Sequence, residues 1–143
     1  MIVLDTDAIS FLVRQKSDIS RQLRNRLAEL SCEHEIFTTV VTYEEQTRGW
    51  MSEFTKALDP QGIIDADNDL LEHLNAYKDL DIVPYTPAAD AKFHALRKQK
   101  IRIGTRDLRI AAIALSHDAT LLTRNLQDFD KVPGLRVEDW TKS

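Results

Sequence analysis

The segment Ile2-Val3-Leu4-Asp5, three apolar residues followed by an acid, indicates the fold class of this chain. Consecutive apolar residues, two of them β-branched, are typical of a strand that is buried on both faces, and such strands belong to parallel sheets. The acid that follows marks the carboxyl end of the strand, where sheets covered by helices bind their ligands. The stretch therefore predicts an α/β fold with Asp5 at the ligand-binding edge of the sheet.

Short apolar strands alternate with helices along the rest of the chain, as they do in parallel sheets covered on both faces. Besides residues 2–4, we expect strands at 36–41, 82–85, 119–123 and 135–137. We expect helices at 8–13, 17–30, 42–58, 67–80, 87–100 and 105–117, and a turn at 59–62. The predicted fold class is therefore α/β, a three-layer α/β/α sandwich with a parallel sheet of about five strands.

Residues at the helix starts and on the helix faces refine this prediction. Thr6 or Asp7 is expected to cap the first helix, and Thr42 is expected to start the helix after the second strand. In the helix at 67–80, apolar side chains recur on one side. They are Leu70, Leu71, Leu74 and Tyr77.

Length and composition describe an ordinary globular chain. The 143 residues fit one domain, 1–143, and shares of 43% hydrophobic and 29% charged residues are typical of folded proteins. The N-terminus lacks the basic start of a signal peptide, and no apolar run is long enough to cross a membrane. Cys32 is the single cysteine, so a reducing compartment is expected. We therefore expect a cytoplasmic protein that does not associate with membranes.

The charges are distributed unevenly along the chain. The net charge of −4 argues weakly against a nucleic-acid partner. However, residues 97–109 carry six basic side chains and one acid, Asp107. Because this basic run brackets a candidate site acid, we expect it to contact substrate. The acidic run at 59–81 is interpreted as a solvated helix face.

Three acids are placed near predicted strand ends. Asp5 follows the first strand, Glu45 lies one helical turn after the second, and Asp107 opens the helix that leads into the fourth. Each has a structural alternative, as a helix cap for Asp5, part of a capping box for Glu45, and a partner of the helix dipole for Asp107. Asn125 and Asp128 lie in the loop after the fourth strand, and both are common turn residues.

The convergence of these acids favours a site. The carboxyl ends of parallel strands meet at one edge of a sheet, so three acids placed there would lie together. Clustered carboxylates repel one another unless a cation is bound. Oxygen ligands without histidine or cysteine favour Mg²⁺ or Mn²⁺, which suit phosphodiester hydrolysis. The sequence therefore predicts a divalent metal site for that chemistry.

Four segments resemble the motifs of PIN-domain nucleases, and most closely those of the VapC-type toxins of bacterial toxin–antitoxin pairs. The first segment is Leu4-Asp5-Thr6-Asp7, and the second is residues 42–49, in which the acid four residues before the glycine is Glu45. The third, at 103–112, is the most specific. The fourth runs from residue 122 to Trp140. The resemblance covers essentially the whole chain.

This resemblance implies a PIN-like fold with a five-stranded parallel sheet, a Mg²⁺ or Mn²⁺ site, RNA cleavage, a homodimer and an inhibitory antitoxin. By their positions in the motifs, Asp5, Glu45 and Asp107 match the acidic metal ligands of the family. Asn125 stands at the fourth ligand position, which is often an aspartate. Asp128 is the alternative ligand for that position.

Further residues are expected around the metal. Thr6 and Thr123 are expected to hydrogen-bond a ligand carboxylate or a metal-bound water. Asp7 stands where many family members have asparagine, and its extra charge either attracts a second ion or caps the helix. The basic residues expected to bind the RNA backbone are Arg106, Arg109, Lys98 and Lys100.

A metal-dependent endoribonuclease, the toxin of a toxin–antitoxin pair, is the function that the sequence favours, and two alternatives stay open. Residues 5–9 are similar to the first motif of phosphatases of the haloacid dehalogenase type, in which Asp5 would be the nucleophile, although Ile9 replaces a threonine of that motif. The second alternative is a PIN module that binds RNA or protein without cutting, against which the intact Asp5, Glu45 and Asp107 argue.

Overall fold

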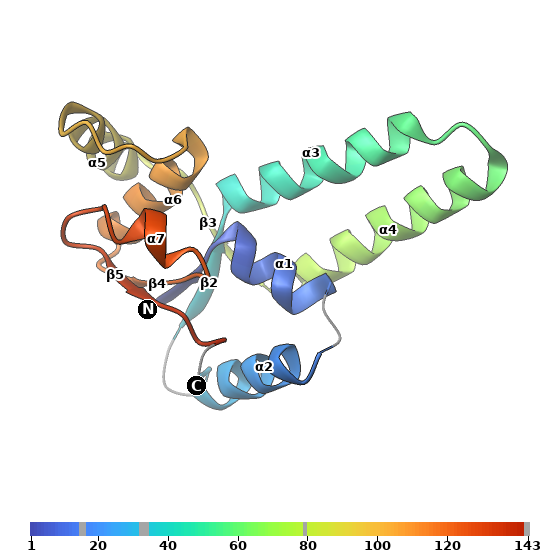
Figure 1. The fold of residues 1–143 in the computed structure, drawn as a ribbon, viewed down its shortest axis with the longest axis horizontal. Coiled ribbons are helices and arrows are strands. Elements are labelled where there is room, and N and C mark those ends of the chain that lie inside the picture. Colours follow the sequence, from blue (N-terminus) through green and yellow to red (C-terminus); the bar gives the residue numbers. More distant parts are fainter. Residues whose placement is uncertain (15–16, 32–34, 79, 142–143) are drawn as a thin grey trace.

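A parallel sheet of five strands forms the centre of the protein (Figure 1). The structure, a computed structural model, describes residues 1–14, 17–31, 35–78 and 80–141. The strands are β1 Ile2–Leu4, β2 Ile36–Thr39, β3 Asp81–Val83, β4 Thr120–Leu122 and β5 Arg136–Glu138. They lie in the order β3-β2-β1-β4-β5, and all neighbouring pairs are parallel. The predicted α/β fold class is confirmed.

Helices cover both faces of the sheet. They are α1 Thr6–Arg14, α2 Asp18–Leu30, α3 Val40–Lys56, α4 Pro60–Lys78, α5 Pro87–Lys98, α6 Thr105–Ser116 and α7 Leu126–Phe129. Consecutive side chains of a strand point to opposite faces of its sheet. Accordingly, Val3 packs into a core with α5 and α6, whereas Ile2 and Leu4 pack into a second core with α1 and α2. This alternation produces the three-layer sandwich.

The second strand is shorter than predicted. Val40 and Val41 are β-branched and so favour a strand, but the chain enters α3 at Val40. Thr39 accepts a hydrogen bond of 3.1 Å from the Thr42 N–H and caps the helix, so the prediction that Thr42 starts it is wrong. Burial of Val41 in the core offsets the low helix preference of a β-branched residue.

α3 and α4 form a long hairpin that extends away from the sheet (Figure 1). The predicted turn at 59–62 is wrong, because α4 begins at Pro60 rather than at 67. Proline is well suited to the first helical position, where the missing N–H needs no partner. Asp59 accepts a hydrogen bond of 2.6 Å from the Gly62 N–H and so satisfies the start of the helix.

The apolar side predicted for α4 is only partly buried. Tyr77 is buried, but Leu71 and Leu74 are 55% and 50% exposed. His73 and Tyr77 face α3, where their rings lie 5.5 and 4.9 Å from the ring of Tyr43. Ring contacts with α3, together with burial of Tyr77 in the core of α1 and α2, therefore hold α4, rather than burial of its leucines against the sheet.

The sequence predicted no membrane-spanning segment and a reducing compartment, and the structure bears on these two expectations differently. None of the helices in the described part of the chain has the length and apolar character needed to cross a membrane. Cys32, from which a reducing compartment was expected, lies outside the described residues.

Candidate active site

A cavity of about 680 Å³ lies at the carboxyl edge of the sheet. Asp5 follows β1, Asn125 lies beyond β4 and Asp139 follows β5, so three strand ends contribute to its wall. The remaining lining residues come from α1, α3, α6 and the segments near these ends. The complete lining is Asp5, Thr6, Asp7, Ser10, Glu45, Asp107, Arg124, Asn125, Asp139 and Thr141. The structure therefore brings the three predicted acids to one cavity.

Asp5 is buried, and both of its carboxylate oxygens accept hydrogen bonds. Oδ1 accepts one of 2.7 Å from the Ala8 N–H, and Oδ2 accepts one of 2.5 Å from the Thr123 hydroxyl. The first bond makes Asp5 the cap of α1, so the prediction of Thr6 or Asp7 as the cap is wrong. The cap and the cavity position are compatible, because one oxygen serves the helix while the other is held from the loop after β4.

Burial raises the pKa of Asp5 from its ordinary value of 3.8 to about 7. The hydrogen bonds from Thr123 and Ala8 lower the pKa because they stabilise the charged form, but they do not offset the loss of water. The charges of Asp7 and Asp107 raise it further. Near neutral pH this carboxyl therefore gains its negative charge at a free-energy cost, which a cation in the cavity would reduce.

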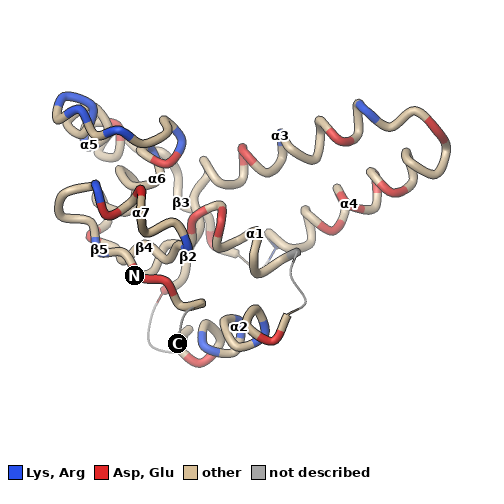
Figure 2. Tube along the Cα trace, in the orientation of Figure 1, with Lys and Arg blue, Asp and Glu red and all other residues tan. Residues whose placement is uncertain are grey.

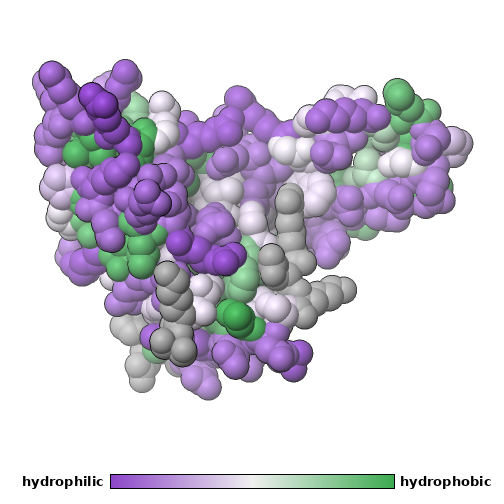
Figure 3. Space-filling model, viewed as in Figure 1, coloured by the Kyte–Doolittle hydropathy of each residue, from purple (hydrophilic) through white to green (hydrophobic). Residues whose placement is uncertain are grey.

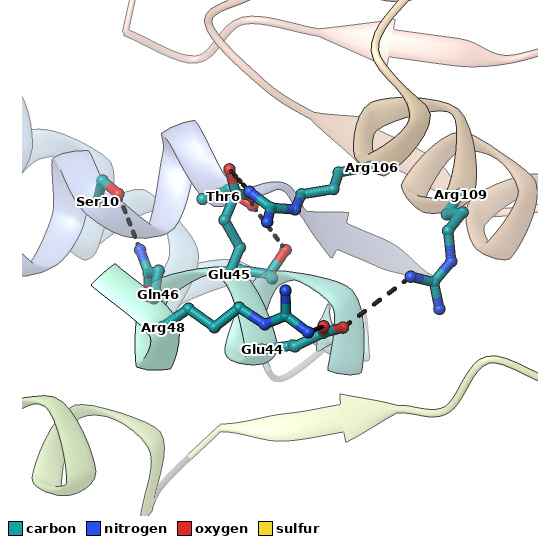
Figure 4. Close-up of polar contacts among 9 residues, drawn as sticks. Thr6, Ser10, Glu44, Glu45, Gln46, Arg48, Arg106 and Arg109 are labelled. Carbon is teal, nitrogen blue, oxygen red and sulfur yellow. Dashed lines mark hydrogen bonds and ion pairs between the residues drawn. The ribbon is translucent and has the colours of Figure 1, made fainter. Parts of the chain in front are cut away.

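Glu45 lies in the second turn of α3 and is held from two sides (Figure 4). The Thr6 hydroxyl donates to its Oε2 at 2.9 Å, and Arg106 lies 3.5 Å from its Oε1. Because Thr39 caps α3, the capping-box alternative for Glu45 is wrong. The side chain is thus left available to the cavity.

Glu44, the neighbouring acid, has different partners. It pairs with Arg48 at 2.8 Å and lies 3.9 Å from Arg109, as Figure 4 shows. It does not belong to the lining of the cavity. The helical turn therefore separates the two adjacent acids, with Glu45 on the side of the cavity.

Asp107 lies in the first turn of α6 and is partly buried. Burial raises its pKa, and the negative charges of Glu45, Asp128 and Asp7 raise it further. Acids from separate segments of the chain therefore influence one another across the cavity. That mutual repulsion favours a bound cation.

Asn125 and Asp128 occupy different places. Asn125 lines the cavity, and its side-chain amide donates a hydrogen bond of 3.0 Å to Oδ2 of Asp128. Asp128 lies in α7, a short helix that the sequence analysis did not predict, and is not a lining residue. It also lies 3.6 Å from Lys131. Asp128 is therefore placed to orient the Asn125 amide, whose oxygen is left available.

The donor set suits a hard divalent cation, since carboxylate and amide oxygens are the ligands that Mg²⁺ and Mn²⁺ prefer. In residues 1–14, 17–31, 35–78 and 80–141, however, no three His, Cys, Asp or Glu side chains are gathered as a group that could hold a metal ion. The acids are distributed over the wall of the cavity. A cation would therefore need the carboxylates to turn toward a common point.

The basic residues predicted to bind RNA lie at different depths. Arg106 contacts Glu45, whereas Arg109 lies over the Tyr85 ring at 4.5 Å from its centroid. Lys98 ends α5 and Lys100 follows it, and neither lines the cavity. Figure 2 shows basic positions gathered at this end of α5 and before α6. The four basic residues therefore lie outside the lining of the cavity.

Several residues of the site were not predicted. Ser10, Arg124, Asp139 and Thr141 line the cavity, and none of them was predicted to belong to the site. Ser10 accepts a hydrogen bond of 2.8 Å from the Gln46 amide, and Gln46 in turn accepts one of 2.5 Å from the Tyr77 hydroxyl. These bonds connect α1, α3 and α4 next to Glu45. The spacing of residues along the chain could not have predicted these contacts between separate helices.

Comparison with known proteins identifies relatives of the chain. The family model of the PIN domain matches residues 2–135. Ribonuclease VapC1 of Haemophilus influenzae strain R2866 is 30% identical over 142 residues, which cover 98% of both chains. The tRNA(fMet)-specific endonuclease VapC of Salmonella typhimurium strain LT2 is 25% identical over 142 residues, which cover 96% of both chains.

Solved structures agree with this comparison. VapBC2 from Rickettsia felis, bound to a DNA fragment from its promoter, has a TM-score of 0.80 at 22% identity and covers 98% of this chain and 99% of that chain. VapBC-1 from nontypeable Haemophilus influenzae has a TM-score of 0.76 at 25% identity, with 99% and 100% covered. The chain therefore belongs to the PIN-domain family, with relatives of the VapC type.

Proposed function

We propose that this chain is an endoribonuclease that hydrolyses RNA phosphodiester bonds with Mg²⁺ or Mn²⁺, and that it is the toxin of a toxin–antitoxin pair. One observation carries the proposal. Asp5, Glu45 and Asp107 line a single cavity in a chain that is 30% identical, over nearly its whole length, to a ribonuclease. The relative's name supplies the substrate class, and the acids supply a physical basis for the chemistry.

The comparisons argue against the alternative that this chain is a phosphatase of the haloacid dehalogenase type. It belongs to a different family from the one that matches residues 2–135. Its first motif also requires a threonine where this chain has Ile9. A binding module without catalysis is the other alternative, and measurement of RNA cleavage distinguishes it.

In the proposed site, Asp5, Glu45 and Asp107 are the metal ligands and Asn125 offers its amide oxygen as a fourth. Bound there, a divalent cation would supply an activated water and positive charge at the phosphate. Arg106 lies 3.5 Å from Glu45 and balances part of its charge. Its side chain is half exposed, so the guanidinium would also be open to a phosphate at the rim of the site.

Other residues of the chain orient these groups. Thr123 and Thr6 donate hydrogen bonds of 2.5 and 2.9 Å to the carboxylates of Asp5 and Glu45. Hydrogen bonds of this kind fix the direction of a metal ligand. Asp7, exposed on the rim, adds negative charge that attracts cations. The basic surface of Arg109, Lys98 and Lys100 would bind the RNA backbone on its way to the cavity.

Two exposed apolar surfaces are evidence for the proposal that this chain binds other proteins. A groove of about 270 Å³ between α1, α2 and α4 is lined mainly by apolar side chains, among them Leu12, Val13 and Leu80. Figure 3 shows further apolar side chains at the far end of the α3–α4 hairpin, where Leu58 is 94% exposed. The two solved relatives are VapBC2 and VapBC-1. We therefore propose a cognate antitoxin and a homodimer for this chain. We also propose a cytoplasmic location, because the proposed substrate, RNA, is found there.

RNA cleavage tests the proposed function directly. We expect the purified chain to cut RNA in the presence of Mn²⁺ or Mg²⁺, to stop when EDTA removes the metal, and to resume when Mn²⁺ is restored. Total bacterial tRNA and ribosomal RNA are suitable substrates, with cut sites mapped by end sequencing. Asp107→Asn should be inactive and Asp67→Asn, an exposed change on α4, should cut like the wild type. Cleavage that persists in EDTA or in Asp107→Asn would contradict the proposal.

Thr123→Val is expected to weaken Mn²⁺ binding roughly tenfold or more, the usual effect of removing a hydrogen bond behind a metal ligand. Valine has nearly the shape of threonine but cannot donate to Asp5, so the carboxylate loses a bond that lowers its pKa. Calorimetric titration at neutral pH measures the affinity. Thr120→Val, the same change at the start of β4, is the control and should bind Mn²⁺ normally. Equal affinities in the two variants would show that Thr123 does not position Asp5.

A further inference from the structure

Arg124 is a residue of the cavity to which the roles above give no task. It lies in the loop after β4, between Thr123, which bonds Asp5, and Asn125. Among the described residues that line the cavity, it alone has a positive charge, whereas five are acids. Its position in a site built for cations therefore needs a separate explanation.

An aromatic ring supports the Arg124 side chain. The guanidinium carbon lies 4.6 Å from the centroid of the Phe11 ring, within the range of a cation–π contact. Phe11 is only 6% exposed and packs in the core with α1 and α2, so the ring is a rigid support. The backbone before and after Arg124 is also held. The Thr123 N–H donates to the Glu138 carbonyl at 3.0 Å, and the Asn125 N–H donates to the Thr123 hydroxyl at 2.9 Å.

Among the described residues, no acid pairs with Arg124 at close range. In the part of the chain that the structure describes, Arg124 forms no ion pair within 4.0 Å, although it shares a cavity with five acids. Arg106, in contrast, lies 3.5 Å from Glu45. An arginine that stacks on a ring and pairs with no carboxylate within 4.0 Å keeps its N–H donors for a ligand.

We infer that Arg124 binds a phosphate group of the RNA backbone inside the cavity, an inference that rests on the proposed function. The acids of the cavity attract cations but repel the substrate, so an entering phosphate needs a positive group on the same wall. A guanidinium presents two parallel N–H donors that match two phosphate oxygens. Arg106, Arg109, Lys98 and Lys100 are not lining residues, so Arg124 is the basic group that meets the RNA within the cavity.

The effect of Arg124→Gln on RNA binding tests this inference. An RNA that the wild type cuts is labelled, and its dissociation constant is measured in the Asp5→Asn background at several salt concentrations. We expect Arg124→Gln to weaken binding roughly tenfold to a hundredfold, as for loss of a charged hydrogen bond. The slope of log Kd against log salt should fall by about 0.7, the value for one phosphate contact on a single strand. Mn²⁺ affinity, measured for Arg124→Gln in the otherwise wild-type chain, should not change.

Three further variants make the result specific. Arg124→Lys should recover the salt slope but only part of the affinity, because lysine keeps the charge and loses the paired donors. Phe11→Leu should keep the slope and weaken binding less than Arg124→Gln. Arg21→Gln removes an exposed arginine of α2 that pairs with Asp18 at 3.0 Å, and it should behave like the Asp5→Asn parent.

The outcomes separate this inference from the proposed function. If the wild type cuts no RNA with metal present, the proposed function is wrong. If the wild type cuts RNA but Arg124→Gln binds it with unchanged affinity and unchanged salt slope, the proposed function stands and the role of Arg124 is wrong. A loss confined to Mn²⁺ binding, or to binding of an antitoxin, would likewise overturn the role assigned to Arg124.

Discussion

The Asp5→Asn variant is expected to cleave RNA about a thousandfold more slowly than the wild-type chain. A bound cation contributes several kcal/mol to a phosphoryl transition state, and each 1.36 kcal/mol lost slows the reaction about tenfold. Asparagine has the shape of aspartate but lacks its charge, so the proposed metal site would lose its most buried ligand. Single-turnover cleavage with saturating Mn²⁺ measures the rate.

The same variant should remain folded, which separates a chemical effect from unfolding. The asparagine oxygen can still accept from the Ala8 N–H and cap α1, and the Thr123 hydroxyl can accept from the new amide. Because the wild-type carboxyl is buried, its replacement by a neutral group should raise the melting temperature of the metal-free protein above pH 7. Asp67→Asn, which removes an exposed charge from α4, should change neither quantity. If Asp5→Asn cleaved RNA at the wild-type rate, the proposal that Asp5 is a metal ligand would be wrong.

The metal-free chain is expected to lose stability as the pH rises from about 4 to about 7. Asp5 has a pKa of about 7 in the folded state against its ordinary value of 3.8, so the folded state holds this proton more tightly across that window. The resulting stability is complete below the lower value and lost as the pH passes the upper one. A shift of this size corresponds to on the order of 4 kcal/mol. The raised pKa of Asp107 acts in the same direction.

Divalent metal should reverse that loss above pH 7. A ligand that binds only the folded state at a hundred times its Kd adds roughly 2.7 kcal/mol, which corresponds to roughly 5 to 10 °C for a chain of this size. Thermal unfolding at pH 5 and pH 8, in EDTA and in Mn²⁺, measures both effects. In Asp5→Asn the dependence on pH and the response to Mn²⁺ should both be reduced. A wild-type chain that is more stable in EDTA at pH 8 than at pH 5 would contradict this prediction.

The general architecture could be predicted because local patterns determine it. The run from Ile2 to Leu4 forms β1, and its three side chains are buried on alternate faces. Strands that alternate with helices produced the parallel sheet and its two helical layers. The boundaries were less predictable. Val40 and Val41 favour a strand locally, yet the Thr39 cap and burial of Val41 place both residues in α3. Pro60 marks the start of α4 rather than a turn, because the side chain of Asp59 caps it.

The site was predicted in part. Glu45 fitted a capping box as well as a metal site, and only the true cap, Thr39, separates these interpretations. Arg124 was overlooked because a single arginine in a loop has no pattern around it. Its support on Phe11 depends on where α1 packs, which no spacing in the sequence reveals.

By itself, the sequence determined the class of fold, the acids at the strand ends and their order along the chain. These properties depend on periodicity and on neighbours within a few residues. The tertiary structure decided the state of Asp5. Its hydrogen bond with Thr123 joins residues 118 positions apart, because β4 lies beside β1 in the sheet. The same packing removes water from the carboxyl and raises its pKa to about 7. Solvent exclusion depends on every element around the group, so no local stretch of sequence encodes it.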